Sequence, residues 1–481
     1  MAWDYASARD ADRAFFRLIG EERALDMLGA FTADRPSRME RMEAGRLIRK
    51  KVPRSAHGTW NPAKRLDPIG IIRRQNATRI QALIALRMER MAASPFAFLR
   101  GSAAVMAADL RRTPISQIEV MACGDMHIAN CGLFASAERQ LVFAINDFDE
   151  VYPGPWEWDV KRLAASAAVA TLHVGGSAKQ ARADAFAAVE SYARHMRRYA
   201  EMGSLEIWYD LIDEQKILAA APPRLHPDIR AATDKARTRG HIRSLGKLTH
   251  EADGVRRLVE EPPALIRETH LADGTPITEM LDAVLTSYIG SLPPDRARLL
   301  SRYRLVDIAR KVVGVGSVGT SCWVILMEGM DAGDPLILQV KEARPSVLAA
   351  HVRKPIPVSN EGRRVVMGQR LIQGSPDVFL GYGSVAGRQV SGDFFLRQLA
   401  DMKGGFSFDE GERDWAGKLP KLVALCGWAL ALAHAKSGDP AMIAGYCGRS
   451  DALPDAIATF SMAYADQTIA DHAALVAHVG A

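Results

Sequence analysis

The feature that most limits the fold is a glycine-rich run in the second half of the chain, Gly314-x-Gly316-x-x-Gly319. A dinucleotide-binding fold would place a helix directly after such a run, because the helix N-terminus holds the pyrophosphate. Here the next residues are TSCWVILMEG, which are rich in β-branched and aromatic types and end in a turn. The run therefore predicts a strand, a glycine loop and a second strand of a small antiparallel sheet. A plain hairpin turn is the alternative.

Short β-rich runs broken by Gly, Asp and Pro continue beyond this loop. They cover Trp323–Glu328 and Leu336–Lys341 and, after a helical segment at about 361–373, Val378–Leu380 and Phe394–Leu399. Lys341 ends an apolar strand, where an unpaired ammonium is costly to bury. It is therefore either a ligand-binding lysine or a solubilising lysine on an edge strand.

Two polar loops earlier in the chain each follow a short apolar strand. CGDMHIANCG comes after Ile118–Ala122, and NDFDE comes after Leu141–Ile145. Polar residues at strand ends are typical of sites built on loops. The candidate site residues of these two loops are Asp125, His127, Asn130, Asp147 and Asp149. Each of them alone could equally be a cap or brace of its own turn.

The spacing of this set suits phosphoryl transfer from ATP. Asn130 follows Asp125 by five positions, and Asp147 follows Asn130 by seventeen. Asp125 would be the base for an acceptor hydroxyl, and Asn130 and Asp147 would be ligands of Mg²⁺. Asp149 is a candidate for a second metal or for the acceptor. His127 either contacts the reactants or braces the loop.

These motifs resemble the catalytic and metal loops of protein kinases, and most of all the aminoglycoside and choline phosphotransferase branch. That branch reads roughly H-G-D-x-H-x-x-N before an I-D-F-type metal loop, whereas Cys123 replaces the first His here and an Asn precedes Asp147. The resemblance implies that Asp159 braces the catalytic loop.

The same resemblance assigns roles to the second half of the chain. The glycine loop with Ser317 would close over the ATP phosphates, and Lys341 would bind them. The usual partner of that lysine is a glutamate, for which Glu361 and Glu342 are candidates. Gln398 would lie in the hinge whose backbone meets adenine.

In kinases the glycine loop precedes the catalytic loop, but here it follows about 190 residues later. We therefore expect an α+β, protein-kinase-like two-lobe fold in circularly permuted order, which is tolerated where chain ends lie at the surface. The unpermuted alternative would use Asp439, but position 444 is Ala rather than Asn. The expected parts are an arm (1–75), a large helical lobe (76–300), a small β-rich lobe (301–405) and C-terminal helices (406–481).

From about residue 40 to its end, the chain also resembles a bacterial family, domain of unknown function 2252. The segments that carry this resemblance are VPRSAHGTW, SPFAFLRG, CGDMHIANCGLF, NDFDEVYPGPWEWDVKRLA, VGVGSVGT, LQVKEA, FLRQLADMKG and LAHAKSGD. The family brings no known substrate. At VVMGQR, Met367 stands where such families usually have Glu, which removes one candidate partner of Lys341.

Composition limits the partners. The net charge of +6 (62 − 56) permits an anionic ligand but is no nucleic-acid footprint. Five scattered cysteines without a C-x-x-C pair suit reduced thiols in the cytoplasm. The most apolar stretches, Leu163–Val174 and Leu422–Ala433, are shorter than a membrane span, and the N-terminus has no secretory h-region.

Three functions fit these observations. The first is an ATP- and Mg²⁺-dependent transferase acting on an unknown hydroxyl or amine. The second is a metal-dependent phosphoesterase, although only His127 could serve it as a histidine ligand nearby. The third is a catalytically silent nucleotide-binding or scaffold protein.

Overall fold

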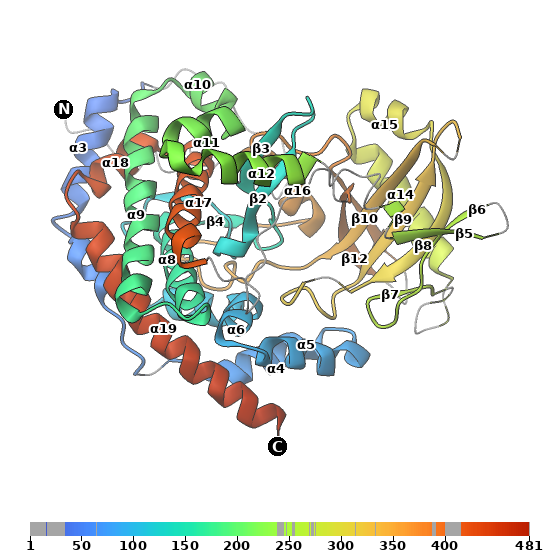
Figure 1. Ribbon diagram of the computed structural model, residues 1–481, viewed down its shortest axis with the longest axis horizontal. Helices are drawn as coiled ribbons and strands as arrows, with labels where there is room; N and C mark the ends of the chain where they lie inside the picture. The colour runs from blue at the N-terminus through green and yellow to red at the C-terminus, as the bar shows by residue number, and fades with distance from the viewer. Residues whose placement is uncertain are drawn as a thin grey trace.

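The computed structural model describes residue 16 and residues 34–480 apart from 64, 238–244, 247, 253–254, 269, 271–273, 275, 313, 332, 387–390 and 400–414. Helices make up 55% and strands 16% of the structure, and every sheet is small and antiparallel, which confirms the expected α+β class at this coarse level. Most helices gather on one side of the molecule and the largest sheet lies on the other (Figure 1).

The N-terminal part is a series of short helices. They are α3 (Arg38–Ile48), α4 (Pro68–Ala77), α5 (Ile84–Ala92), α6 (Pro95–Gly101) and α7 (Ala103–Leu110), with 3₁₀ turns at 54–58 and 81–83. Asp67 caps α4 and Ser94 caps α6, each with Pro as the first helical residue. The apolar pattern of residues 76–93 predicts one helix, but the structure divides this range among the end of α4, a 3₁₀ turn and α5. Part of the expected arm at 1–75 lies outside the described residues.

The arm is tied to the helical part by a buried ion-pair network. Arg65 lies 2.6 Å from a carboxylate oxygen of Asp109 on α7 and 2.6 Å from one of Asp471 on α19 (Ala452–Val479). The hydroxyl of Tyr464 donates to the same Asp109 carboxylate at 2.9 Å. This network fixes the course of the arm across two helices that are far apart in the chain.

Two small hairpin-like sheets present the polar loops. β1 (Glu119–Ala122) pairs with β4 (Tyr152–Pro155), and β2 (Cys131–Ala135) pairs with β3 (Leu141–Ile145), all antiparallel. The strands expected at 118–122 and 141–145 are thus present, because each is a short apolar run that ends in polar residues. The first loop lies between β1 and β2, and the second between β3 and β4.

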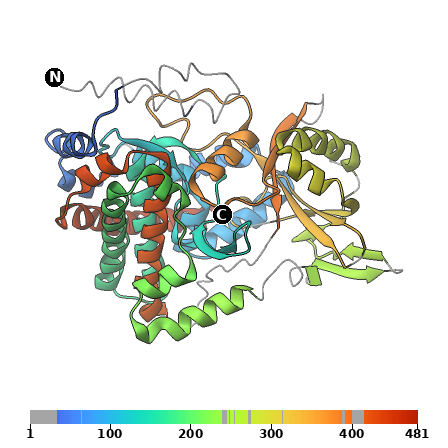
Figure 2. The same cartoon turned by 90° about the horizontal axis from the view of Figure 1, so that it is seen from above.

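A helix buried on all sides forms the centre of the helical part. α8 (Trp156–His173) is buried at every position from Trp156 to Thr171, as expected for a helix surrounded by others. Its neighbours include α9 (Ala178–Glu201), α17 (Trp415–Ser437) and α19, and α18 (Pro440–Cys447) packs on α9. Seen from above, these helices stay on the side away from the largest sheet (Figure 2).

The sequence predicted one helix from Trp158 to about Met202, but α8 ends and α9 begins within this range. Ser177 caps α9: its side chain accepts from the Gln180 N–H, and the Gln180 side chain accepts from the Ser177 N–H at 2.8 Å. We expect Ser177→Ala to lower the free energy of unfolding by about 1 kcal/mol, because the N-cap acceptor is lost. Urea denaturation measures this. Ser204→Ala, at an exposed serine that caps no helix, is the control, and equal effects of the two changes would refute the cap assignment.

The largest sheet has six antiparallel strands in the order β11-β12-β10-β9-β8-β7. Their bounds are β7 (Leu265–Ile266), β8 (Arg304–Lys311), β9 (Cys322–Glu328), β10 (Pro335–Ala343), β11 (Gly381–Ala386) and β12 (Ser391–Gln398). The glycine loop connects β8 to β9, as the strand-like residues after it predicted. The strand expected at Val378–Leu380 is wrong: these residues form a turn before β11, in which the Leu380 N–H donates to the Asp377 carbonyl.

Three helices accompany this sheet. α16 (Glu361–Ile372) connects β10 to β11, and α14 (Ile277–Ser291) and α15 (Pro294–Leu300) come before β8. Tyr288 of α14 packs in one apolar cluster with Trp323 and Leu396 of the sheet. Residues 277–300 therefore belong with the sheet, because α14 buries its apolar face against the strands. The sequence-based division had placed them in the helical lobe.

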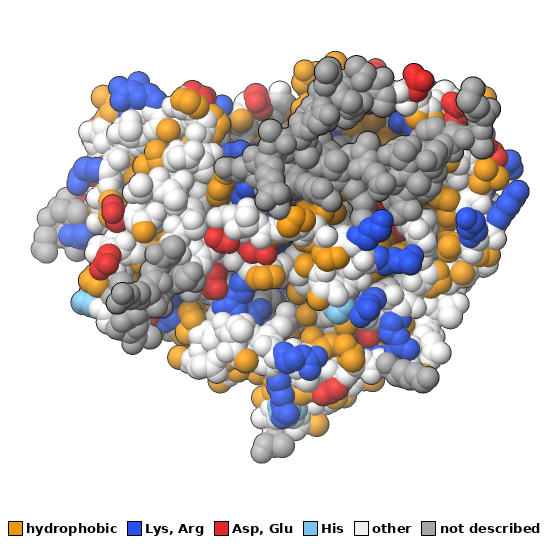
Figure 3. All heavy atoms as spheres, turned by 180° about the vertical axis from the view of Figure 1, so that it is seen from behind, with side chains coloured by type: hydrophobic (Ala, Val, Ile, Leu, Met, Phe, Trp, Pro, Cys, Tyr) orange, Lys and Arg blue, Asp and Glu red, His pale blue; other side chains and the backbone are white. Residues whose placement is uncertain are grey.

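The remaining elements are α10 (Ser204–Tyr209), α11 (Glu214–Ala220), α12 (His226–Arg237), β5 (Thr249–Ala252) and β6 (Val255–Leu258). None of the described helices is both long and apolar enough to cross a membrane. All five cysteines are buried free thiols. Figure 3 shows the Lys and Arg side chains of one face in small groups separated by other residues, without a continuous basic stripe.

Candidate functional site

Segments from distant parts of the chain meet at one cavity of about 280 Å³. Its walls come from the loop after β1, the loop after β3, the glycine loop, residues 342–347 at the end of β10, and the N-terminal residues 75–79 and 100–103. Of the residues proposed from the sequence, those that line it are Asp125, His127, Asn130, Asp147, Asp149, Gly314, Gly316 and Ser317. The fold therefore brings both acidic loops to the glycine loop, although about 190 residues separate Asp125, and about 165 separate Asp149, from Gly314 in the chain.

The loop after β1 is held from below by Asp159 of α8. One carboxylate oxygen accepts the Cys123 N–H at 2.6 Å and the other accepts the Gly124 N–H at 2.9 Å. His434 of α17 completes this contact, with its Nε2 3.1 Å from the same carboxylate. Asp159 therefore braces the loop, as its resemblance to the kinase motif implied.

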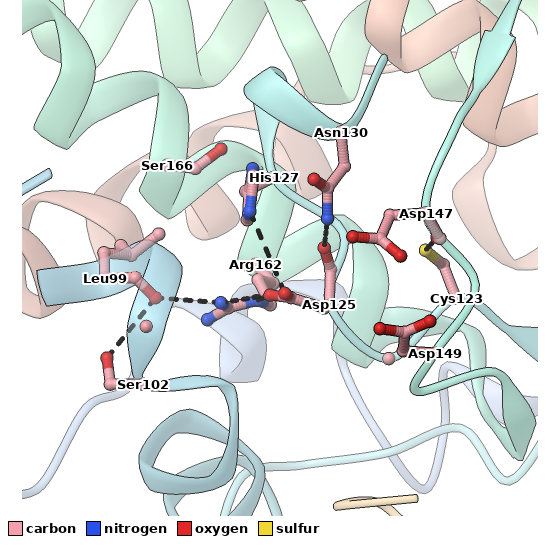
Figure 4. A network of polar contacts seen from close by, with 12 residues as sticks. Leu99, Ser102, Cys123, Asp125, His127, Asn130, Asp147, Asp149, Arg162 and Ser166 are labelled. Atoms are coloured by element: carbon pink, nitrogen blue, oxygen red, sulfur yellow. Dashed lines mark hydrogen bonds and ion pairs between the residues drawn. The ribbon is translucent and has the colours of Figure 1, made fainter. Parts of the chain in front are cut away.

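Asp125 presents its carboxylate between Arg162 and the cavity (Figure 4). Both Nε, at 2.8 Å, and Nη2 of Arg162 donate to Oδ1. Oδ2 lies 3.8 Å from Nε2 of His127. Burial raises the pKa of Asp125 to about 6 despite the opposing charge of Arg162, so the carboxyl is largely ionised at neutral pH. Oδ2 is thus the oxygen left for a ligand.

His127 is almost fully buried beside this carboxylate, and its Nδ1 has no hydrogen-bond partner. Burial, together with the charges of Arg100 and Arg162, lowers the pKa of His127 well below its usual value. The imidazole is therefore neutral. A neutral imidazole with an unpartnered nitrogen at a cavity wall can exchange a hydrogen bond with a ligand.

The loop after β3 faces Lys341 of β10. The Lys341 Nζ lies 2.5 Å from Oδ2 of Asp149 and 4.0 Å from Oδ1 of Asp147. Although burial favours the neutral amine, these two carboxylates raise the pKa of Lys341. Lys341 is therefore a buried charged residue in the interior of the sheet, and its alternative interpretation as a solubilising edge lysine is wrong.

Neither glutamate expected as the partner of Lys341 makes that contact. Glu361 pairs with Arg364 at 2.5 Å within α16. Glu342 pairs with Arg344 at 2.8 Å and accepts the Ser321 N–H. Lys341 is instead paired with Asp149, which lies in the first half of the chain.

The glycine loop is pinned from outside by the N-terminal helices. Gly314 and Gly319 have φ angles of +64° and +85°, which glycine adopts without strain. Arg90 donates to the Gly314 carbonyl at 2.7 Å, and the Ile80 N–H donates to the Gly319 carbonyl at 2.8 Å. On its inner side, Ser317 Oγ lies 3.4 Å from Asp149 Oδ2. The loop is thus fixed close to the second acidic loop.

Gly319, Lys341 and Gln398 do not line the cavity. Gly319 faces the side chain of Arg79 instead. Gln398 ends β12, where its backbone N–H already donates to the Asp377 carboxylate. That N–H is therefore committed within the protein, and the next part of the expected hinge, residues 400–405, lies outside the described residues.

Four arginines at or beside the site were missed from the sequence. Arg79, Arg100 and Arg344 line the cavity, and Arg162 holds Asp125 from behind. The pattern around Arg79 indicates an amphipathic helix, and SPF at 94–96 indicates its end, so neither gave a reason to select Arg79 or Arg100. Two segments that carry the family resemblance were the available signals: SPFAFLRG contains Arg100, and NDFDEVYPGPWEWDVKRLA contains Arg162.

Two side-chain oxygens of the acidic loops are available to a metal ion. Asn130 Nδ2 donates to the Asp125 carbonyl at 2.8 Å, so its Oδ1 is the atom left for a metal. Asp149 Oδ1 is a buried oxygen without a hydrogen-bond partner. No set of three or more His, Cys, Asp or Glu side chains within the described ranges is arranged to hold a metal. Mg²⁺ commonly takes one or two protein carboxylates plus phosphates and water.

A family model described as "Uncharacterized protein conserved in bacteria (DUF2252)" matches residues 79–478. The chain belongs to the DUF2252 family. A search of curated proteins and a search of solved structures gave no match. In this DUF2252 protein the matched span begins at Arg79, later than the residue of about 40 expected from sequence, and contains every residue named at the cavity except Gln75 and Thr78.

One glycine sets the contact between the two acidic loops of the DUF2252 protein. Gly124 has a φ of +80°, and an added Cβ would overlap the Glu150 carbonyl oxygen. We expect Gly124→Ala to lower the free energy of unfolding by at least about 2 kcal/mol, through the left-handed backbone and the overlap. Chemical denaturation measures it. Gly175→Ala is the matched control, because its φ is +83° with open space around it. Equal losses of unfolding free energy in the two variants would show that the overlap with Glu150 does not contribute to the destabilisation.

Proposed function

We propose that this protein is an ATP- and Mg²⁺-dependent phosphotransferase with a protein-kinase-like two-lobe fold in circularly permuted order. The observation that carries the proposal is the 4.0 Å approach of Lys341 Nζ to Asp147 Oδ1 beside a cavity that Asp125, Asn130 and the glycine loop share. These are the parts that phosphoryl transfer needs: a base, metal ligands, and a cation with a loop for the phosphates.

The order of elements in the large sheet supports this proposal. A glycine loop connects β8 to β9, Lys341 lies on β10, and α16 follows. Protein kinases also have a glycine-rich loop, a lysine on the third strand and a helix after it. In this chain the catalytic and metal loops come first, so the proposed lobes are joined in the opposite order.

Asp125 is the proposed base. The proton of an acceptor hydroxyl passes to Asp125 Oδ2 as the acceptor oxygen forms a bond to the γ-phosphorus, and the bond from that phosphorus to the β–γ bridging oxygen breaks to release ADP. Arg162 keeps Oδ1 in place, which leaves Oδ2 directed at the cavity. His127, neutral and adjacent, orients the acceptor.

Asn130 and Asp147 are the proposed ligands of the magnesium ion, and Asp149 holds either a second ion or Lys341. When bound, Mg²⁺ supplies charge neutralisation for the phosphate oxygens. Lys341 then exchanges part of its contact with Asp149 for the phosphates. Five buried free thiols suit a reducing compartment, and we assign the protein to the cytoplasm.

The test is nucleotide-dependent stabilisation followed by turnover. We expect Mg-ATP to raise the melting temperature, because a ligand at 100 times its Kd adds about 2.7 kcal/mol to the folded state. Chelation of the metal should reduce this shift. Lys341→Met should abolish most of it, whereas Lys354→Met, at an exposed lysine, should leave it unchanged.

The other two functions give different results in the same assay. Hydrolysis of a generic phosphoester without ATP would favour the metal-dependent phosphoesterase. Stabilisation by Mg-ATP without ADP formation, with water or any acceptor, would favour a silent nucleotide-binding protein. Absence of any nucleotide-dependent shift would overturn the proposal.

A further inference from the structure

Arg100 is a cation of the cavity wall for which the described part of the chain supplies no ion-pair partner. It lies near the end of α6, and its Nε is buried without a hydrogen-bond partner. No carboxylate among the described residues lies within 4 Å of its guanidinium, and its nearest aromatic contact is the Phe96 ring at 5.9 Å. A guanidinium in this situation is costly unless a ligand pairs with it.

The other arginines at the site are occupied to different degrees. Arg162 is committed to Asp125, and Arg344 to Glu342 and to the Thr78 backbone. Arg79 uses Nη1 to hold the Val318 carbonyl at 2.6 Å, while its Nε is buried without a partner. Arg100 therefore keeps the most donors available, and Arg79 keeps some.

Arg100 lies on the side of the proposed base. Its charge acts on Asp125 and, to a lesser extent, on Asp147, and burial together with Arg100 and Arg162 lowers the pKa of the His127 imidazole. The Arg100 carbonyl would lie 3.3 Å from a Cβ on Gly316, so the end of α6 also touches the glycine loop. A group bound by Arg100 therefore sits beside the place where Asp125 would meet an acceptor hydroxyl.

The cavity also limits the size of that acceptor. Residues 75–79 and 100–103 close it from the N-terminal side, and Arg90 and Ile80 fix the glycine loop to those helices. A volume of about 280 Å³ is at the lower end for ligand sites. It suits phosphates and the reacting end of a small molecule.

We propose that the acceptor is a small molecule carrying both a hydroxyl and an anionic group, and that Arg100 binds this anionic group. The inference rests on the proposed phosphotransferase function. The planar fork of an arginine matches either a carboxylate or a phosphate with two parallel hydrogen bonds, so the chemistry shared by the two is what the structure specifies.

The experiment titrates two anionic probes into the full chain with Mg²⁺ and a non-hydrolysable β,γ-imido analogue of ATP. Calorimetry first measures the analogue alone, and then inorganic phosphate or acetate in its presence. The analogue fills the γ-phosphate position, so a second anion reports on the acceptor side. We expect at least one probe to bind, and Arg100→Met to weaken it by tenfold or more. Arg74→Met, at an exposed arginine of α4, should leave its affinity unchanged.

The outcomes separate the two levels of the proposal. Failure of the analogue to bind refutes the phosphotransferase and the inference with it. If the analogue binds but neither probe does, or if Arg100→Met binds the probes as the wild type does, only the inference fails. Binding of phosphate alone or of acetate alone supports the inference and identifies the acceptor's anionic group, and binding of both supports it without choosing between them. The melting temperature of unliganded Arg100→Met should be unchanged or higher, and a large decrease would mean that Arg100 is structural.

Discussion

Asp125→Asn is expected to lower the rate of phosphoryl transfer by about 10²–10⁴-fold, the range that a general base contributes. Asparagine keeps the shape of the side chain but cannot take the proton of the acceptor hydroxyl. Its amide oxygen can still accept the hydrogen bonds of Arg162, so the loop should keep its position. The hydrogen bond from the Asn130 side-chain amide to the backbone carbonyl of residue 125 is also unaffected.

Steady-state ADP release and the thermal shift with Mg-ATP measure the two halves of this prediction. The apparent affinity for Mg-ATP, derived from this thermal shift, should change by no more than a few-fold, because Asp147, Asn130 and Lys341 are unchanged. Asp213→Asn, at a helix cap outside the cavity, is the control for a general effect of losing a carboxylate. Unchanged turnover in Asp125→Asn would remove the base assignment, whichever nucleotide the protein binds.

The parts of the fold that followed from the sequence are those decided by local chemistry. β3 coincides with the predicted run Leu141–Ile145, since an apolar strand ended by polar residues has clear bounds. The break between α8 and α9 was missed, although Gly175, Gly176 and the capping serine Ser177 all mark it. The alanine-rich pattern on either side hid these signals. The placement of α14 on the sheet depends on which apolar face meets which, and local sequence does not carry that information.

The candidate site divides in the same way. Asp125, Asn130 and Asp147 could be selected from spacing, because each loop presents its polar residues over a few positions. The Lys341–Asp149 pair could not, because it joins two segments separated by 192 positions and depends on how the sheet docks on the helical part. Arg100 was missed for a related reason: an arginine becomes informative only when its surroundings lack a partner.

The brace beneath the catalytic loop leads to the second large prediction. Asp159→Ala is expected to lower the free energy of unfolding by about 3–5 kcal/mol, the cost of removing one partner from a buried polar contact. The Asp159 side chain is 1% exposed and His434 is 0% exposed, so water cannot replace the missing carboxylate. The N–H groups of Cys123 and Gly124 would lose their acceptors, and each unsatisfied buried donor costs about 1–3 kcal/mol.

Guanidinium denaturation followed by circular dichroism measures this loss, and Asp213→Ala provides the scale. Asp213 caps α11 by accepting the Lys216 N–H at 2.9 Å, so its removal should cost only about 1 kcal/mol. Where Asp159→Ala remains folded, turnover should fall with nucleotide stabilisation largely kept, because Asp159 positions the loop that carries Asp125 and does not touch the phosphates. A loss no larger than that of Asp213→Ala would mean that the loop holds its shape without the brace, and the position of Asp125 would then depend on Arg162 alone.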